Sequence, residues 1–117
     1  MEIEVVSFDV PGGVIDISPV KRSEALLPFL TEKDRTELDG FASSARRNER
    51  ATWRAVARRR IGNLPIEYNE LGAPMLMQSK SGAANHLGVA HTNSFVAVFF
   101  SDRRCAVDIE DTGRNFE

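Results

Sequence analysis

The 117-residue sequence contains a single cysteine, Cys105, and no long hydrophobic run. One cysteine cannot form an internal disulfide, which argues against a disulfide-stabilised secreted fold. No stretch approaches the roughly 20 consecutive apolar residues of a membrane-spanning helix. The acidic start, Met1 to Glu4, does not resemble a secretion signal. These absences predict a cytoplasmic protein that does not enter a membrane.

The chain also lacks a strong net charge, since its formal value is −2 at pH 7. Its cations are nevertheless concentrated in one segment, which contains Arg46, Arg47, Arg50, Arg54, Arg58, Arg59 and Arg60. One basic segment in a nearly neutral chain favours a local anion site over a surface that coats nucleic acid. Interleaved aromatic residues typical of a nucleic-acid surface are missing as well. We therefore expect no nucleic-acid partner.

The hydrophobic pattern predicts strands near both ends of the chain and helices between them. Thr31, with Asp34 three residues later, forms a capping-box signature for a short helix. Gly62 is a stop signal for a longer one that begins at Ser43 or Ser44. The expected helices cover residues 22–30, 32–39 and 44–61, and the expected strands cover residues 2–10, 14–17, 66–68, 74–77, 86–91, 94–101 and 105–110. This order predicts one α+β domain over residues 1–117, with a mostly antiparallel sheet packed against one long helix.

Two carboxylates near the end of the chain have a spacing that suits a metal ion. Asp108 and Glu110 alternate with apolar residues, so in a strand they share one face. If the hairpin between the last two strands turns at residues 102–103, Ala97 lies across from Asp108 and leaves space above the carboxylates. Such a pair suits Mg²⁺, which proteins hold through one or two carboxylates plus substrate phosphates and water. The alternative is an ordinary half-exposed strand whose acids face water.

Other candidates for chemistry are donors to phosphate. His91 and Thr92 end one expected strand and can both donate to phosphate oxygens. Arg47, Arg50 and Arg54 follow one face of the long helix, and arginine forms planar two-point contacts with phosphate. The alternative for His91 and Thr92 is an ordinary loop histidine followed by a turn threonine. The alternative for the arginines is a solvated helix face.

These segments occur in an order that resembles a known family. The relevant segments are Arg46-Arg47 through Ala57-Arg58, Ile66-Glu67-Tyr68, Gly72-Ala73-Pro74, Leu87-Gly88-Val89-Ala90-His91-Thr92, Phe95-Val96-Ala97-Val98 and Ala106-Val107-Asp108-Ile109-Glu110. Together they are similar to the first lobe of the large, pseudo-dimeric 4′-phosphopantetheinyl transferases. The similarity covers about residues 15–112 of the chain.

The resemblance implies a reaction and a set of roles. Members of this family transfer the phosphopantetheine arm of coenzyme A to a serine of an acyl or peptidyl carrier protein. By resemblance, Asp108 and Glu110 would be catalytic and would hold Mg²⁺ on the diphosphate. The coenzyme A phosphates would be held by His91, Thr92, Arg47, Arg50 and Arg54.

The chain departs from the family pattern at positions that matter for activity. Ala73 stands where the family has a phosphate-binding lysine, and no Lys-Glu pair occurs in the sequence. In the family that pair lies in a second lobe and supplies the catalytic lysine and a third metal carboxylate. The chain is therefore either a fragment of a longer protein or a shortened relative. Transfer is expected to be impaired without the second lobe, and the alternative is a non-catalytic module that binds coenzyme A or phosphate.

A lone lobe would expose the surface that normally meets its partner lobe. We therefore expect a twofold homodimer with Asp108 and Glu110 facing the cleft between subunits. The candidate contact residues are Phe95, Val96, Val98, Phe99 and Phe100.

Overall fold

The computed structural model describes residues 3–76 and 86–101. The elements are, in order, β1 (Val6–Val10), β2 (Gly13–Pro19), α1 (Ser23–Leu26), the 3₁₀ turn η1 (Leu27–Phe29), α2 (Glu32–Leu38), α3 (Ser44–Ile61), β3 (Ile66–Tyr68), β4 (Pro74–Leu76), β5 (His86–His91) and β6 (Phe95–Ser101). The predicted α+β class is confirmed: a four-stranded antiparallel sheet packs against one long helix.

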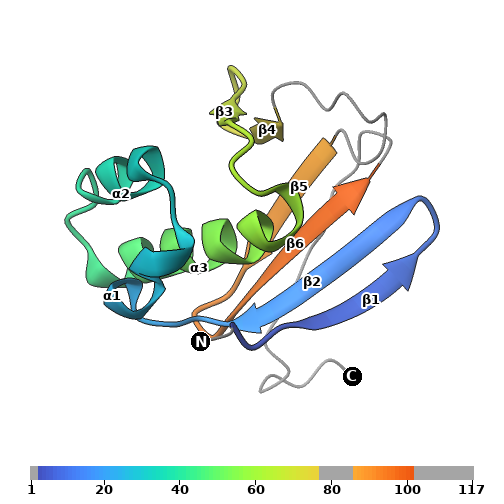
Figure 1. Ribbon diagram of the computed structural model, residues 1–117, viewed down its shortest axis with the longest axis horizontal. Helices are drawn as coiled ribbons and strands as arrows, with labels where there is room; N and C mark the ends of the chain where they lie inside the picture. The colour runs from blue at the N-terminus through green and yellow to red at the C-terminus, as the bar shows by residue number, and fades with distance from the viewer. Residues whose placement is uncertain (1–2, 77–85, 102–117) are drawn as a thin grey trace, which may run out of the picture.

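The main sheet joins the two ends of the described chain. Its strand order is β1-β2-β6-β5, and each neighbouring pair is antiparallel. Figure 1 shows the helices grouped to one side of this sheet, with the blue β1–β2 hairpin beside the orange β6. The hairpin turns at Gly12, whose φ of 81° lies in the region that glycine adopts without strain. The short β3 and β4 strands form a separate antiparallel pair.

The position of β6 overturns one expectation from the sequence. Ala97 pairs with Ile17 of β2 on one side and with Ala90 of β5 on the other. Both edges of β6 are thus occupied along the strand, and the predicted pairing of Ala97 with Asp108 is wrong. The strand expected over 105–110 lies outside the described residues.

Local signals place the helices where the sequence predicts them. The Thr31 hydroxyl accepts a hydrogen bond from the Asp34 amide, and the Asp34 carboxylate accepts one from the Thr31 amide, so the predicted capping box is confirmed. Ser43 caps α3, which ends at Gly62 with a φ of 60°. The single helix expected over 22–30 is instead divided into α1 and η1, because Pro28 has no amide hydrogen to continue an α-helix.

The core lies between α3 and one face of the sheet. Trp53, Val56 and Ala57 of α3 pack in one buried cluster with the β6 residues Val96, Val98 and Phe100. A second cluster joins α1, α2 and α3 through Leu26, Leu30, Leu38, Ala51 and Ala55. None of the helices in the described ranges combines the length and apolar character that a bilayer crossing requires.

The apolar residues of β6 that were predicted to form an exposed surface lie on two opposite faces of the sheet. Val96, Val98 and Phe100 are buried under α3, so their assignment to an exposed surface is wrong. Phe95 and Phe99 point to the opposite face, because side chains alternate along a strand. Phe95 is exposed and Phe99 is partly exposed.

Candidate functional site

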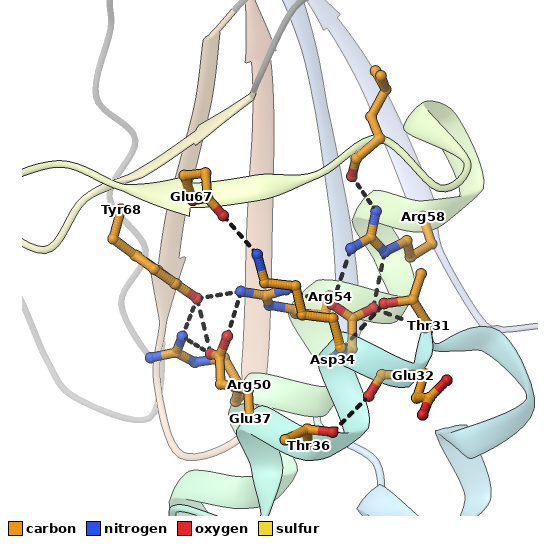
Figure 2. A network of polar contacts seen from close by, with 12 residues as sticks. Thr31, Glu32, Asp34, Thr36, Glu37, Arg50, Arg54, Arg58, Glu67 and Tyr68 are labelled. Carbon is orange, nitrogen blue, oxygen red and sulfur yellow. Dashed lines mark hydrogen bonds and ion pairs between the residues drawn. The ribbon is translucent and has the colours of Figure 1, made fainter.

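Three arginines of α3 form an internal ion-pair cluster. This arginine cluster consists of Arg50, Arg54, Arg58, Asp34, Glu37 and Tyr68. In Figure 2, the Asp34 carboxylate lies between two guanidinium groups, those of Arg54 and Arg58. Arg54 also donates to a Glu37 carboxylate oxygen at 2.7 Å and to the Tyr68 hydroxyl at 2.6 Å. The cluster therefore joins α2, α3 and β3.

Aromatic rings pack against Arg50 at the solvent-accessible side of the arginine cluster. Arg50 pairs with Glu37, and its guanidinium carbon lies 5.0 Å from the centre of the Phe41 ring and 5.1 Å from that of Tyr68. Such cation–π contacts add to the ion pair when the guanidinium is partly desolvated. Arg50 is thus held by groups of its own chain.

This geometry does not support the assignment of Arg50 and Arg54 to coenzyme A phosphates. The Arg54 side chain is only 2% exposed, and its terminal nitrogens donate to Asp34, Glu37 and Tyr68. A phosphate would have to displace these acceptors and enter the core. Both arginines are therefore left out of the binding site proposed below.

The cluster holds Asp34 in its charged form. Burial by itself raises the pKa of Asp34, but hydrogen bonds from Arg58, the Thr31 amide and Arg54 outweigh it and lower the pKa to about 2. Burial likewise raises the pKa of Tyr68, although Arg54 and Arg50 oppose the change. At neutral pH the cluster contains an ionised Asp34 and a neutral Tyr68.

The low pKa of Asp34 predicts acid sensitivity. The pKa of Asp34 is about 2 in the folded chain, against a reference value of 3.8. The stability that ionised Asp34 contributes to the fold is therefore complete above about pH 4 and is lost as the pH falls through 2. We expect the wild-type free energy of unfolding to fall by about 2 kcal/mol more than that of Asp34→Asn over this interval. Urea unfolding at pH 2 to 6 measures the difference. Equal pH dependence of both proteins would contradict it, and Asp39→Asn, at the exposed end of α2, is the matched control.

His91 is the sequence-predicted site residue that the structure leaves accessible. It ends β5 on the sheet face that packs against α3, and its side chain is 51% exposed. Its Nδ1 lies 3.4 Å from a carboxylate oxygen of Glu49, whose side chain is mostly buried. A proton on Nδ1 makes this contact attractive, which leaves Nε2 as the ring nitrogen available to a ligand.

The other predicted phosphate ligands have different positions. The Thr92 hydroxyl accepts hydrogen bonds from the amides of Ser94 and Phe95, which closes the turn from β5 to β6. Arg47 donates to the Phe41 carbonyl oxygen at 2.8 Å. Because it is two residues from Glu49, Arg47 lies about 200° around α3 from it. The structure therefore does not bring Arg47 and His91 together.

The sequence analysis did not assign Glu49 to the site and named Arg46 only as part of the basic segment. Glu49 contacts His91 directly, and Arg46 lies three residues before Glu49, which places it on a neighbouring part of the same helix surface. Arg46 is exposed. One signal could have identified Glu49, because it is the only acidic residue in α3, among seven arginines.

The predicted metal ligands, Asp108 and Glu110, lie outside the described residues. Within residues 3–76 and 86–101, no group of three or more histidine, cysteine, aspartate or glutamate side chains could hold a metal ion. A scan against protein-family models gives no match, and a search of curated proteins gives none either.

Proposed function

We infer that the chain is a lobe of a 4′-phosphopantetheinyl transferase, a Mg²⁺-dependent enzyme that moves the phosphopantetheine arm of coenzyme A to a carrier-protein serine. The observation that carries this proposal is the accessible His91 at the end of β5, beside the basic helix α3. The order of the sequence segments described above supports it. In this proposal the protein acts in the cytoplasm, where its acyl or peptidyl carrier protein would be found.

The accessible residues suit a phosphate group better than a neutral ligand. When protonated, His91 donates from Nε2 to phosphate while Nδ1 faces Glu49. Arg46 adds an exposed cation near the same helix surface. Arg47 lies on the other side of the helix, so it would contact a different phosphate of the same extended ligand. Thr92 is kept in the proposal because it directly follows His91 at the end of β5, although its amide and hydroxyl also hold the turn to β6.

Asp108 and Glu110 are proposed as the metal ligands. A bound Mg²⁺ would supply charge neutralisation on the diphosphate as the bond to the phosphopantetheine arm breaks. The carboxylates would fix the ion, and His91 would orient the leaving phosphates. The proton of the carrier serine needs a base, and the family's lysine for that step is missing from this sequence.

A non-catalytic coenzyme A-binding module is the second candidate. The turn between β3 and β4 favours this candidate. Ala73 is exposed in that turn, at the position where the resemblance implies a phosphate-binding lysine, so a phosphate contact of the enzymes is missing there. The two candidates share the binding site and differ in whether transfer occurs.

Calorimetry with coenzyme A and Mg²⁺ tests the shared site. We expect Mg²⁺ to bind weakly alone and more tightly in the presence of coenzyme A, because two carboxylates leave most of the coordination shell to phosphate and water. The double variant Asp108→Ala, Glu110→Ala should lose this Mg²⁺ binding. Equal binding by the double variant would refute the metal assignment. Mass spectrometry of a carrier protein incubated with both ligands then separates the enzyme from the binding module.

A further inference from the structure

The sheet face that points away from α3 is almost entirely apolar. The strand pairing places on it Val6, Phe8, Val10, Gly13, Ile15, Ile17, Pro19, Gly88, Ala90, Phe95, Ala97 and Phe99. Only His86 and Ser101, at one end, are polar. This set is called the outer face below. Among the residues of the described strands, it contains no acidic residue, lysine or arginine.

The outer face retains substantial exposed apolar surface. Val6 is 56% exposed, Phe8 50% and Phe95 42%. Among the described elements, the helix that packs on the sheet is α3, and it covers the opposite face through the cluster around Val56 and Val98. The centre of the face is less open, because Ala97 is only 1% exposed and Ile15 and Ile17 are partly buried. Exposed apolar side chains gathered on one face usually mark a protein–protein contact.

The distribution of large and small residues indicates which partner fits. One edge strand, β1, carries the large Val6 and Phe8, whereas the other edge strand, β5, carries the small Ala90 and Gly88. Val6 lies in the same row as Ala90, and Phe8 lies in the same row as Gly88. A twofold axis along the strands would place β1 of one copy over β5 of another, and each large residue would then face a small one.

We propose that the outer face is the interface of a homodimer, in which two copies pack sheet against sheet about a twofold axis parallel to the strands. Val6 then faces Ala90 of the second copy, and Phe8 faces Gly88, with both contacts repeated by symmetry. On the two central strands, Ile17 faces the small and nearly buried Ala97, whereas Ile15 faces the large Phe99. Because the face carries no acid, lysine or arginine, no like charges are brought together.

The size of the face sets the expected strength of the dimer. Four strands about 4.8 Å apart, with rows of side chains about 7 Å apart, span roughly 20 Å by 20 Å. Two such faces bury about 800 Å² in projection, and more in accessible area, which is near the lower limit for a specific interface. We therefore expect a reversible dimer at micromolar concentration, with or without coenzyme A.

Sedimentation of the full chain tests the interface. Phe8→Asp should raise the dimer dissociation constant at least about 100-fold, because each copy would bury an unpaired charge. Leu71→Asp is the matched control, since Leu71 is 91% exposed but lies outside the outer face, and it should dimerise like wild type. If Phe8→Asp does not fold, as judged by circular dichroism, Val6→Lys serves at the same edge strand. A monomeric wild type, or a Phe8→Asp dimer, would overturn the proposal, and residues 102–117 or a different protein would then be the covering partner.

Cross-linking tests the direction of the axis. In a Cys105→Ser background, Val6→Cys and Ala90→Cys proteins are mixed and treated with a short bismaleimide. The proposed axis predicts a linked dimer in the mixture and little linkage in either protein alone. Linkage of Val6→Cys to itself would indicate an axis perpendicular to the strands and would overturn the proposed geometry.

Discussion

Replacing Arg54 with alanine is expected to lower the free energy of unfolding by about 3–5 kcal/mol, the usual cost of removing one partner from a buried ion pair. The guanidinium group of Arg54 donates to Asp34, Glu37 and Tyr68 and is almost completely buried. Its removal leaves these acceptors short of a donor and opens a cavity beside Trp53. Urea unfolding of wild type and variant at neutral pH measures the loss.

Arg59→Ala provides the matched comparison. Arg59 lies in the same helix but is exposed, so its replacement should change the free energy of unfolding by no more than about 0.5 kcal/mol. If the two variants were equally stable, the arginine cluster would contribute no net stability. The assignment of Arg54 to a structural role would then have to be withdrawn.

His91→Ala is expected to weaken coenzyme A binding by roughly 10- to 100-fold, which corresponds to the loss of one charge-assisted hydrogen bond. Glu49→Gln should have a smaller effect in the same direction, because it replaces the carboxylate that contacts Nδ1 and helps to orient the ring. Calorimetry of wild type and both variants under identical conditions measures these differences.

His86→Ala controls for the loss of a histidine from β5. His86 lies at the opposite end of that strand and on the outer face, away from Glu49. Its replacement should leave binding unchanged. If His91→Ala bound coenzyme A as wild type does, the phosphate site would lie elsewhere, and the dimer proposed from the outer face would be unaffected.

Features that depend on neighbouring residues could be predicted from the sequence. Thr31 and Asp34 are three residues apart, and their reciprocal hydrogen bonds need no information from the rest of the chain. Gly62 ends α3 because of its own backbone conformation. The division of the 22–30 segment also has a local cause, the missing amide hydrogen of Pro28.

Features that depend on distant residues could not be predicted. Arg54 meets Asp34 and Glu37 from another helix, and nothing in the spacing of the arginines distinguishes that burial from a solvated face. The pairing of β2 with β6 could not be predicted either, because the two strands are far apart in sequence. β2 occupies the edge of β6 with which residues 105–110 would have paired in a hairpin. Glu49 was missed because its contact with His91 crosses from helix to sheet.

The pairing of β2 with β6 has a consequence for synthesis on the ribosome. Ile17 and Ala97 are cross-strand partners about 80 residues apart in sequence. Contacts between residues so distant in sequence are typical of proteins that fold slowly. The β1–β2 hairpin emerges first but cannot acquire its neighbour until β6 has left the exit tunnel. At translation speeds of about 5–20 residues per second, Ile15 and Ile17 remain without that neighbour for several seconds. During this interval β1 and β2 are accessible to chaperones and to other nascent copies. In the folded chain, β6 covers the edge of β2 that is accessible at this stage.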